Sequence, residues 1–111
     1  MTSVTKANFA NEGEFNQLLS NEKLVVADYS ATWCGPCRVV APLIDRLASE
    51  YSDRATVIKI DIDENKDIAK KYGIRSIPAV LVFRDGEVVE SLFGSKPYET
   101  YSNILETQLK L

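Results

Sequence analysis

The chain has 111 residues, 45% of them hydrophobic and 26% charged, a composition typical of one globular domain that buries its own core. Its formal charge of −3, without long runs of one sign, argues against a surface that binds nucleic acid. The absence of histidine excludes Ser-His-Asp and Cys-His catalysis and every histidine-ligated metal site.

Apolar periodicity and turn-forming residues predict alternating strands and helices along the chain. Pro42 falls within a helical pattern and is expected to kink that helix. In the first half of the chain we expect a strand over residues 2–5, a helix over 8–20 capped by Asn8 or Asn11, a strand over 23–30 and a helix from the two cysteines to residue 51. In the second half we expect a strand over residues 55–63 and a helix that begins at Asp63 or Glu64 and stops at Gly73. A hairpin over 77–93 that turns at Asp85-Gly86 and a helix whose first residue is Pro97 complete the chain.

This order, βαβαβαββα, predicts a single α/β domain over residues 1–111. Alternating strands and helices give parallel strands with right-handed crossovers, and the hairpin adds an antiparallel edge. We therefore expect a mixed five-stranded sheet flanked by four helices on its two faces. The cysteines follow the strand at 23–30, and open α/β sheets place their sites at the carboxyl ends of strands.

The two cysteines of the chain, Cys34 and Cys37, are three residues apart at a predicted helix start. One helical turn brings them within disulfide reach, but the loop that they close is too short to add much stability. A reversible disulfide therefore suits this spacing better than a structural one. The unpaired N–H groups of the helix start favour a thiolate at Cys34. We expect Cys34 to attack a substrate disulfide and Cys37, more buried, to resolve the mixed disulfide.

The residues around the cysteines suit the same chemistry. Pro36 presets a helical φ and stiffens the loop, and Gly35 lets another backbone approach the sulfur. Trp33 is expected to form a flat apolar wall beside them, with a core aromatic as the alternative.

Two charged residues interrupt the predicted buried strands. Burial should raise the pKa of Asp28 and make it a proton acceptor for Cys37, directly or through a water. Lys59 is a candidate ionic partner of Asp28. The alternatives are a surface-facing aspartate and a solvated lysine at a strand end.

Together these segments resemble the thioredoxin family. WCGPC at residues 33–37 is that family's active-site motif, and VVADY, APLIDRLA, VIKIDIDEN and KYGIRSIPAVLVFRDGEVV surround it in the family's order, so that the match covers roughly residues 20–95. The resemblance implies a thioredoxin fold and a protein-disulfide reductase. It implies that Cys34 is the nucleophile, Cys37 the resolving cysteine, Asp28 the buried acid and Lys59 its partner.

The resemblance also implies a substrate-docking surface made by Trp33, the Ile77 backbone and Gly94. It implies a cis peptide bond at Pro78, whereas the general frequency of cis X–Pro bonds favours trans. Ser30 and Ala79 depart from the tryptophan and threonine common in the family. These two departures leave partner preference and redox poise open.

The partners expected from the resemblance are disulfide-containing target proteins and a reductase, either an NADPH-dependent flavoenzyme or a ferredoxin-linked enzyme. No bound cofactor and no metal are expected, and the protein is expected to be a monomer. Without an 18-residue apolar run or a secretory signal, we expect a cytoplasmic protein that does not enter membranes. An organelle stroma is the alternative if a transit peptide was removed.

Three other functions stay open at this point. An oxidant or isomerase would use the same cysteines in an oxidising compartment. A binding or scaffold subunit would leave them idle. A structural disulfide, or a metal shared between two chains, is the third.

Overall fold

The computed structural model describes residues 6–111, and it confirms the predicted order of elements. The strand predicted over residues 2–5 lies outside the described residues. The elements are β1 (Asn8–Phe9), α1 (Glu12–Asn21), β2 (Leu24–Ser30), α2 (Gly35–Glu50), β3 (Thr56–Asp61), α3 (Lys66–Lys71), β4 (Ala79–Arg84), β5 (Glu87–Phe93) and α4 (Tyr98–Leu109).

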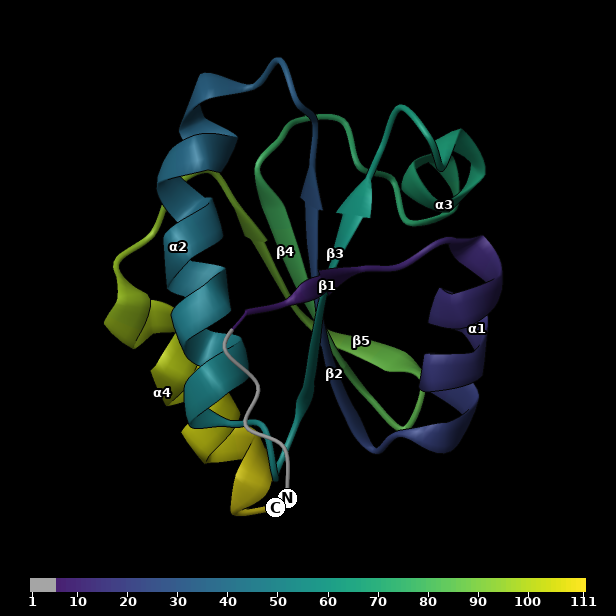
Figure 1. The fold of residues 1–111 in the computed structure, drawn as a ribbon. Coiled ribbons are helices and arrows are strands. Elements are labelled where there is room, and N and C mark those ends of the chain that lie inside the picture. Colours follow the sequence, from purple (N-terminus) through teal and green to yellow (C-terminus); the bar gives the residue numbers. More distant parts are fainter. Residues whose placement is uncertain (1–5) are drawn as a thin grey trace.

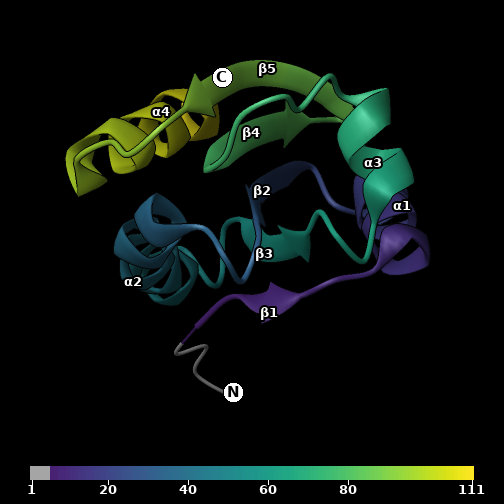
Figure 2. The same ribbon diagram turned by 90° about the horizontal axis from the view of Figure 1, so that it is seen from above.

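The five strands form one mixed sheet in the order β1-β3-β2-β4-β5. β1, β3 and β2 are parallel, whereas β4 and β5 run antiparallel to their neighbours, as predicted. Helices α2 and α4 cover one face of the sheet, and α1 and α3 cover the other (Figure 1). The view from above shows the strands between these two pairs of helices (Figure 2). The predicted mixed sheet with helices on both faces is therefore confirmed.

Each face of the sheet has its own apolar core, because successive side chains of β2 point to opposite faces. Val26 and Val80 lie in the cluster beneath α2 and α4, with Ile44 and Leu105. The other cluster lies beneath α1 and α3 and includes the fully buried Tyr29. Asp28 continues the alternation of Val26 and so belongs to the α2–α4 face.

Three predicted helix starts are wrong, two of them because a side chain binds the backbone. Helix α1 begins at Glu12 rather than residue 8, because Asn11 and Glu14 form a capping box. Of the two predicted N-caps, Asn11 is therefore confirmed and Asn8 is wrong. Helix α3 begins at Lys66, because the Asp61 carboxylate accepts the N–H groups of residues 63 and 64 and holds them in a turn. Pro97 caps α4 and is not its first residue.

The predicted turns are confirmed. Asp85 and Gly86 have φ of 53° and 82°, as a tight hairpin between β4 and β5 requires, and Gly73 has φ of 66° after α3. Pro42 lies within α2, which continues on both sides of it to Glu50. The predicted kink at Pro42 stays a prediction.

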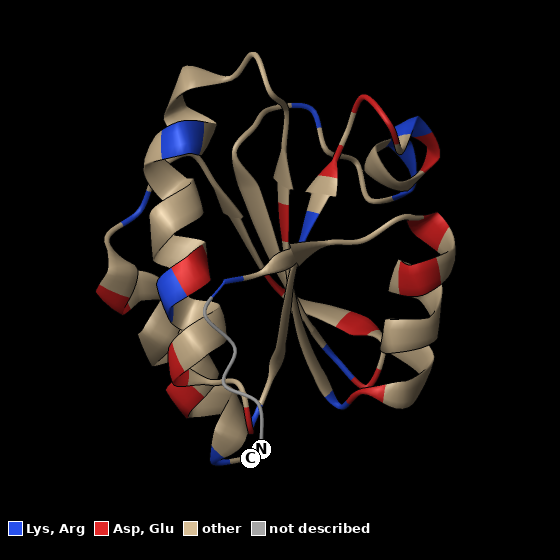
Figure 3. Cartoon of the chain, in the orientation of Figure 1, with Lys and Arg blue, Asp and Glu red and all other residues tan. Residues whose placement is uncertain are grey.

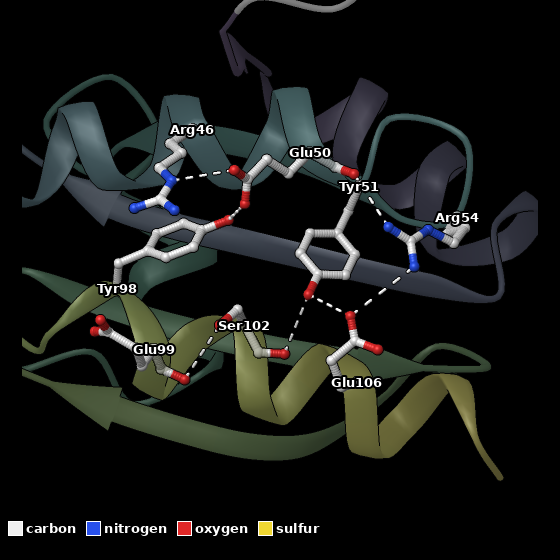
Figure 4. Close-up of polar contacts among 8 residues, drawn as sticks. All are labelled: Arg46, Glu50, Tyr51, Arg54, Tyr98, Glu99, Ser102 and Glu106. Atoms are coloured by element: carbon white, nitrogen blue, oxygen red, sulfur yellow. Dashed lines mark hydrogen bonds and ion pairs between the residues drawn. The ribbon is translucent and has the colours of Figure 1, made fainter.

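Polar contacts fasten α4 to α2 (Figure 4). The Tyr98 hydroxyl donates to Glu50, and the Tyr51 hydroxyl donates to Glu106. Arg46 lies over the Tyr98 ring, 3.8 Å from its centroid. These contacts fix how α4 lies against the sheet.

Charged residues of both signs alternate over α2 and α3, whereas α1 and α4 carry only acidic ones (Figure 3). No helix among residues 6–111 combines the length and apolar character needed to cross a membrane.

Candidate active site

Cys34 and Cys37 form a disulfide where β2 leads into α2. Their Cα atoms are 5.3 Å apart, within the range for a bridge across one helical turn. Cys34 is the N-cap of α2, and its Sγ accepts the backbone N–H of Cys37 at 3.2 Å. A sulfur in this position meets an N–H donor and the positive end of the helix dipole, both of which favour a thiolate.

The two cysteines are buried almost equally, at 5% and 4% exposure. Cys37 is the more buried, as predicted, but by so small a margin that burial does not distinguish the two sulfurs, because the first helical turn encloses both residues. They pack with Ala31 and with the partly buried Ile62 and Ile77.

Trp33 lies on the surface beside the disulfide, with 67% of its area exposed, so the alternative of a core aromatic is wrong. Its indole N–H donates to Asp63 Oδ2 at 2.8 Å. Gly35 and Pro36 are also exposed, and a Cβ added to Gly35 would meet no atom within 4 Å. The space next to the sulfurs is therefore open to an approaching chain.

Asp28 is buried, with 1% of its area exposed. Burial raises its pKa to about 7, the positive charge of Lys59 lowers the pKa, and the negative charge of Asp45 raises it. Its Oδ1 atom has no hydrogen-bond partner among residues 6–111. The alternative of a surface-facing aspartate is wrong.

Lys59 is also buried, which excludes the alternative of a solvated lysine at a strand end. It lies beside Asp28 in the β2–β3 register, but its ion pair is with Asp45 of α2, at 2.9 Å. The prediction that Lys59 forms an ion pair with Asp28 is therefore wrong. The positive charge of Lys59 nevertheless lowers the pKa of Asp28. Sequence reasoning missed Asp45, whose only signal was an acidic residue among the apolar ones of α2.

A cavity of about 290 Å³ joins the buried charges to Cys37. Asp28, Lys59 and Cys37 all line it, and Ser30 lies at its wall. Asp28 and Cys37 therefore line the same cavity. A larger cavity of about 490 Å³ lies between α1 and β3 and contains none of these residues.

The Ile77–Pro78 peptide bond is cis, as the resemblance implies and against the general preference for trans. Pro78 accepts the N–H of Gly94 at 2.8 Å, which brings Gly94 next to it. Ile77 precedes β4, and its backbone makes no hydrogen bond within the described part of the chain. Ala79 is fully buried on the α1–α3 face.

Within residues 6–111, no three side chains of His, Cys, Asp or Glu are grouped as metal ligands would be. The arrangement suits redox chemistry instead, because it combines a reversible disulfide, a buried acid and an open approach.

Comparisons with known proteins agree with this chemistry. The family model described as Thioredoxin matches residues 5–107. The chain is 43% identical over 107 residues to "Thioredoxin 1" of Synechococcus elongatus, covering 96% of this chain and 95% of that protein. It is 46% identical over 90 residues to "Thioredoxin" of Bacillus subtilis, covering 81% and 86%. The structure of an N21Q mutant thioredoxin from Halobacterium salinarum superposes with a TM-score of 0.88 at 33% identity, covering 100% of this chain and 97% of that one.

Proposed function

The chain belongs to the thioredoxin family and is a protein thiol–disulfide oxidoreductase, and we propose that Cys34 attacks target disulfides while Cys37 resolves the mixed disulfide. The observation that carries this division of roles is the N–H of Cys37 donated to Cys34 Sγ at the N-cap of α2. That donor stabilises negative charge on Cys34 and has no counterpart for Cys37 among the hydrogen bonds of residues 6–111.

The reaction proceeds in two exchanges. The Cys34 thiolate attacks one sulfur of the target, the target S–S bond breaks, and the released target sulfur takes a proton. Cys37 then loses its proton, attacks Cys34 Sγ and expels the second target sulfur, which is protonated in turn. The target disulfide gains two electrons and two protons, and Cys34 and Cys37 become a disulfide.

Asp28 is the acceptor of the Cys37 proton in this proposal. With a pKa of about 7, a substantial share of Asp28 is ionised at neutral pH and can take up a proton. The shared cavity gives a route between the two groups, directly or through a water. Lys59 and Asp45 act on Asp28 through their charges and are positioning residues.

The target chain is proposed to dock over Trp33, Gly35 and Pro36 and along Ile77, Pro78 and Gly94. The free backbone of Ile77 can pair with an extended target segment, as an added strand would. The exposed indole of Trp33 supplies apolar contact area beside the sulfurs.

Disulfide-containing proteins and a thioredoxin reductase are the partners of the family, and the Cys34–Cys37 pair itself carries the electrons. We propose that the reductase is NADPH- or ferredoxin-dependent, that the protein acts as a monomer, and that it works in the cytoplasm or in an organelle stroma.

The test is the reduction of insulin by dithiothreitol, followed by turbidity. The unmodified chain should accelerate it, and Cys34→Ser should return the rate to that without protein. Cys37→Ser is the matched control, because it should lack multiple turnover yet accumulate a covalent insulin adduct on Cys34. Full activity of Cys34→Ser would contradict the proposal.

A further inference from the structure

Three buried polar side-chain atoms lack a hydrogen-bond partner within residues 6–111. Two of them, Asp28 Oδ1 and the Tyr101 hydroxyl, belong to the α2–α4 face of the sheet. The third, the Tyr29 hydroxyl, lies on the opposite face. Burying a polar group without a partner is costly, so two such groups on one face call for a common explanation.

The packing brings Tyr101 towards Asp28. Asp28 pairs with Val80 across β2 and β4, and Val80 and Val26 belong to the same packed cluster as Tyr101. Tyr101 is 2% exposed and lies on α4, which the contact between Tyr98 and Glu50 fastens to α2 (Figure 4). The Tyr101 ring is therefore held in the layer that covers the buried carboxyl.

The Asp28 carboxylate and the Tyr101 hydroxyl also interact electrostatically. Burial raises the pKa of the Tyr101 hydroxyl, the backbone of Lys96 lowers it, and the negative charge of Asp28 raises it again. Tyr101 therefore keeps its proton throughout the pH range in which Asp28 ionises, and it can act as a neutral donor.

We propose that Tyr101 is a positioning residue for Asp28: one water molecule accepts a hydrogen bond from the Tyr101 hydroxyl and donates one to Asp28 Oδ1. This inference rests on the proposed role of Asp28 as the acceptor of the Cys37 proton. A donor at Oδ1 favours the ionised carboxyl and leaves the other oxygen to face the cavity shared with Cys37.

Other groups act on the same carboxyl and have to stay constant in a test. They face Asp28 or its cavity from β3 and from α2, and β4 contributes only the apolar Val80 beside it. These groups are Lys59, Asp61, Asp45, Cys37 and Arg38.

The test is the titration of the Asp28 carboxyl carbon by ¹³C NMR in Tyr101→Phe, which keeps the ring and removes only the hydroxyl. We expect the midpoint to rise by about one pH unit, since one hydrogen bond to a charged group is lost. Tyr29→Phe is the matched control and should leave the midpoint unchanged, because its hydroxyl lies across the sheet. An unchanged midpoint in Tyr101→Phe would overturn the proposal.

A second measurement needs no variant. In the unmodified chain the ¹³Cζ shift of Tyr101 should change at the midpoint of Asp28, while that of Tyr29 should not. A Tyr101 signal that ignores this titration would also overturn the proposal.

These titrations do not depend on turnover, so they separate this proposal from the proposed function. If the function is wrong, Cys34→Ser keeps its activity while the carboxyl titration still responds to Tyr101. If only the Tyr101 proposal is wrong, Cys34→Ser is inactive, the Asp28 midpoint is the same in Tyr101→Phe as in the unmodified chain, and the Tyr101 ¹³Cζ shift does not follow the Asp28 titration.

Discussion

Lys59 Nζ lies 2.9 Å from Asp45 Oδ1, so the buried lysine of β3 pairs with α2 and not with the buried acid beside it in the sheet. The pair places opposite charges near Asp28, and each acts on its pKa in its own direction. Burial remains the largest influence on that pKa. The acid of the site is therefore tuned by a neighbouring ion pair of which it is not a member.

Replacing either member of this pair should shift the Asp28 titration in a defined direction. Lys59→Met removes a positive charge and should raise the midpoint, whereas Asp45→Asn removes a negative charge and should lower it, each by on the order of one pH unit or less. Carboxyl ¹³C titration measures both. Shifts of the same sign in the two variants would mean that repacking, not charge, governs Asp28.

Asp28→Asn should stabilise the protein at neutral pH. The ordinary pKa of 3.8 becomes about 7 on folding, so the folded state binds more protons than the unfolded chain between these values. Stability from the protonated acid is present below about pH 4 and is lost as pH rises through about 7. The difference amounts to about 4 kcal/mol at most.

Urea unfolding at pH 8 and at pH 4 measures this effect. The gain of Asp28→Asn over the unmodified chain should be large at pH 8 and should vanish near pH 4. The same variant should resolve mixed disulfides more slowly, because an amide accepts no proton from Cys37. A pH-independent gain would show that the pKa of Asp28 is not raised.

The hydrogen bond from Trp33 to Asp63 should hold the indole in the position that a target chain meets. Asp63→Ala frees the ring, so we expect a loss of about fivefold in kcat/KM for insulin, mostly in KM. Asp63→Asn is the matched control, since its amide oxygen still accepts from the indole. Trp33 is the single tryptophan, so its fluorescence reports the ring directly. Equal kinetics in Asp63→Ala would remove this contact from target docking.

Much of this site could be predicted because its signals are local. The spacing of Cys34 and Cys37, the helix start and a carboxylate within an apolar run are each contained in a few consecutive residues. The cis bond at Pro78 was implied only by the resemblance, because sequence statistics favour the other isomer. The wrong starts of α1 and α3 arose where the side chains of Asn11 and Asp61 bind the backbone and so decide the boundary.

The partners of the buried charges could not be predicted in the same way. Asp45 meets Lys59 only because α2 packs over β3, and Tyr101 shares a face of the sheet with Asp28 only because α4 lies on that face. Such contacts depend on how helices lie against the sheet, which apolar periodicity does not determine. From residue type alone, Asp28 was a candidate partner of Lys59, because both are charged residues in predicted buried strands.

The contact between Tyr98 and Glu50 should contribute to stability in a pH-dependent way. The Tyr98 hydroxyl, followed by Arg46, lowers the pKa of Glu50, so the ionised carboxylate is the form that the folded state favours. This stabilisation is present above the ordinary pKa of a glutamate and is lost as pH falls through the lowered value. Tyr98→Phe should therefore lower the midpoint of thermal unfolding by a few degrees at pH 7, and the difference should shrink in acid. Tyr29→Phe is the control, because its hydroxyl has no partner to lose among residues 6–111. A deficit of Tyr98→Phe that persists unchanged at pH 3 would assign its effect to packing, because a protonated Glu50 is no longer a charged acceptor.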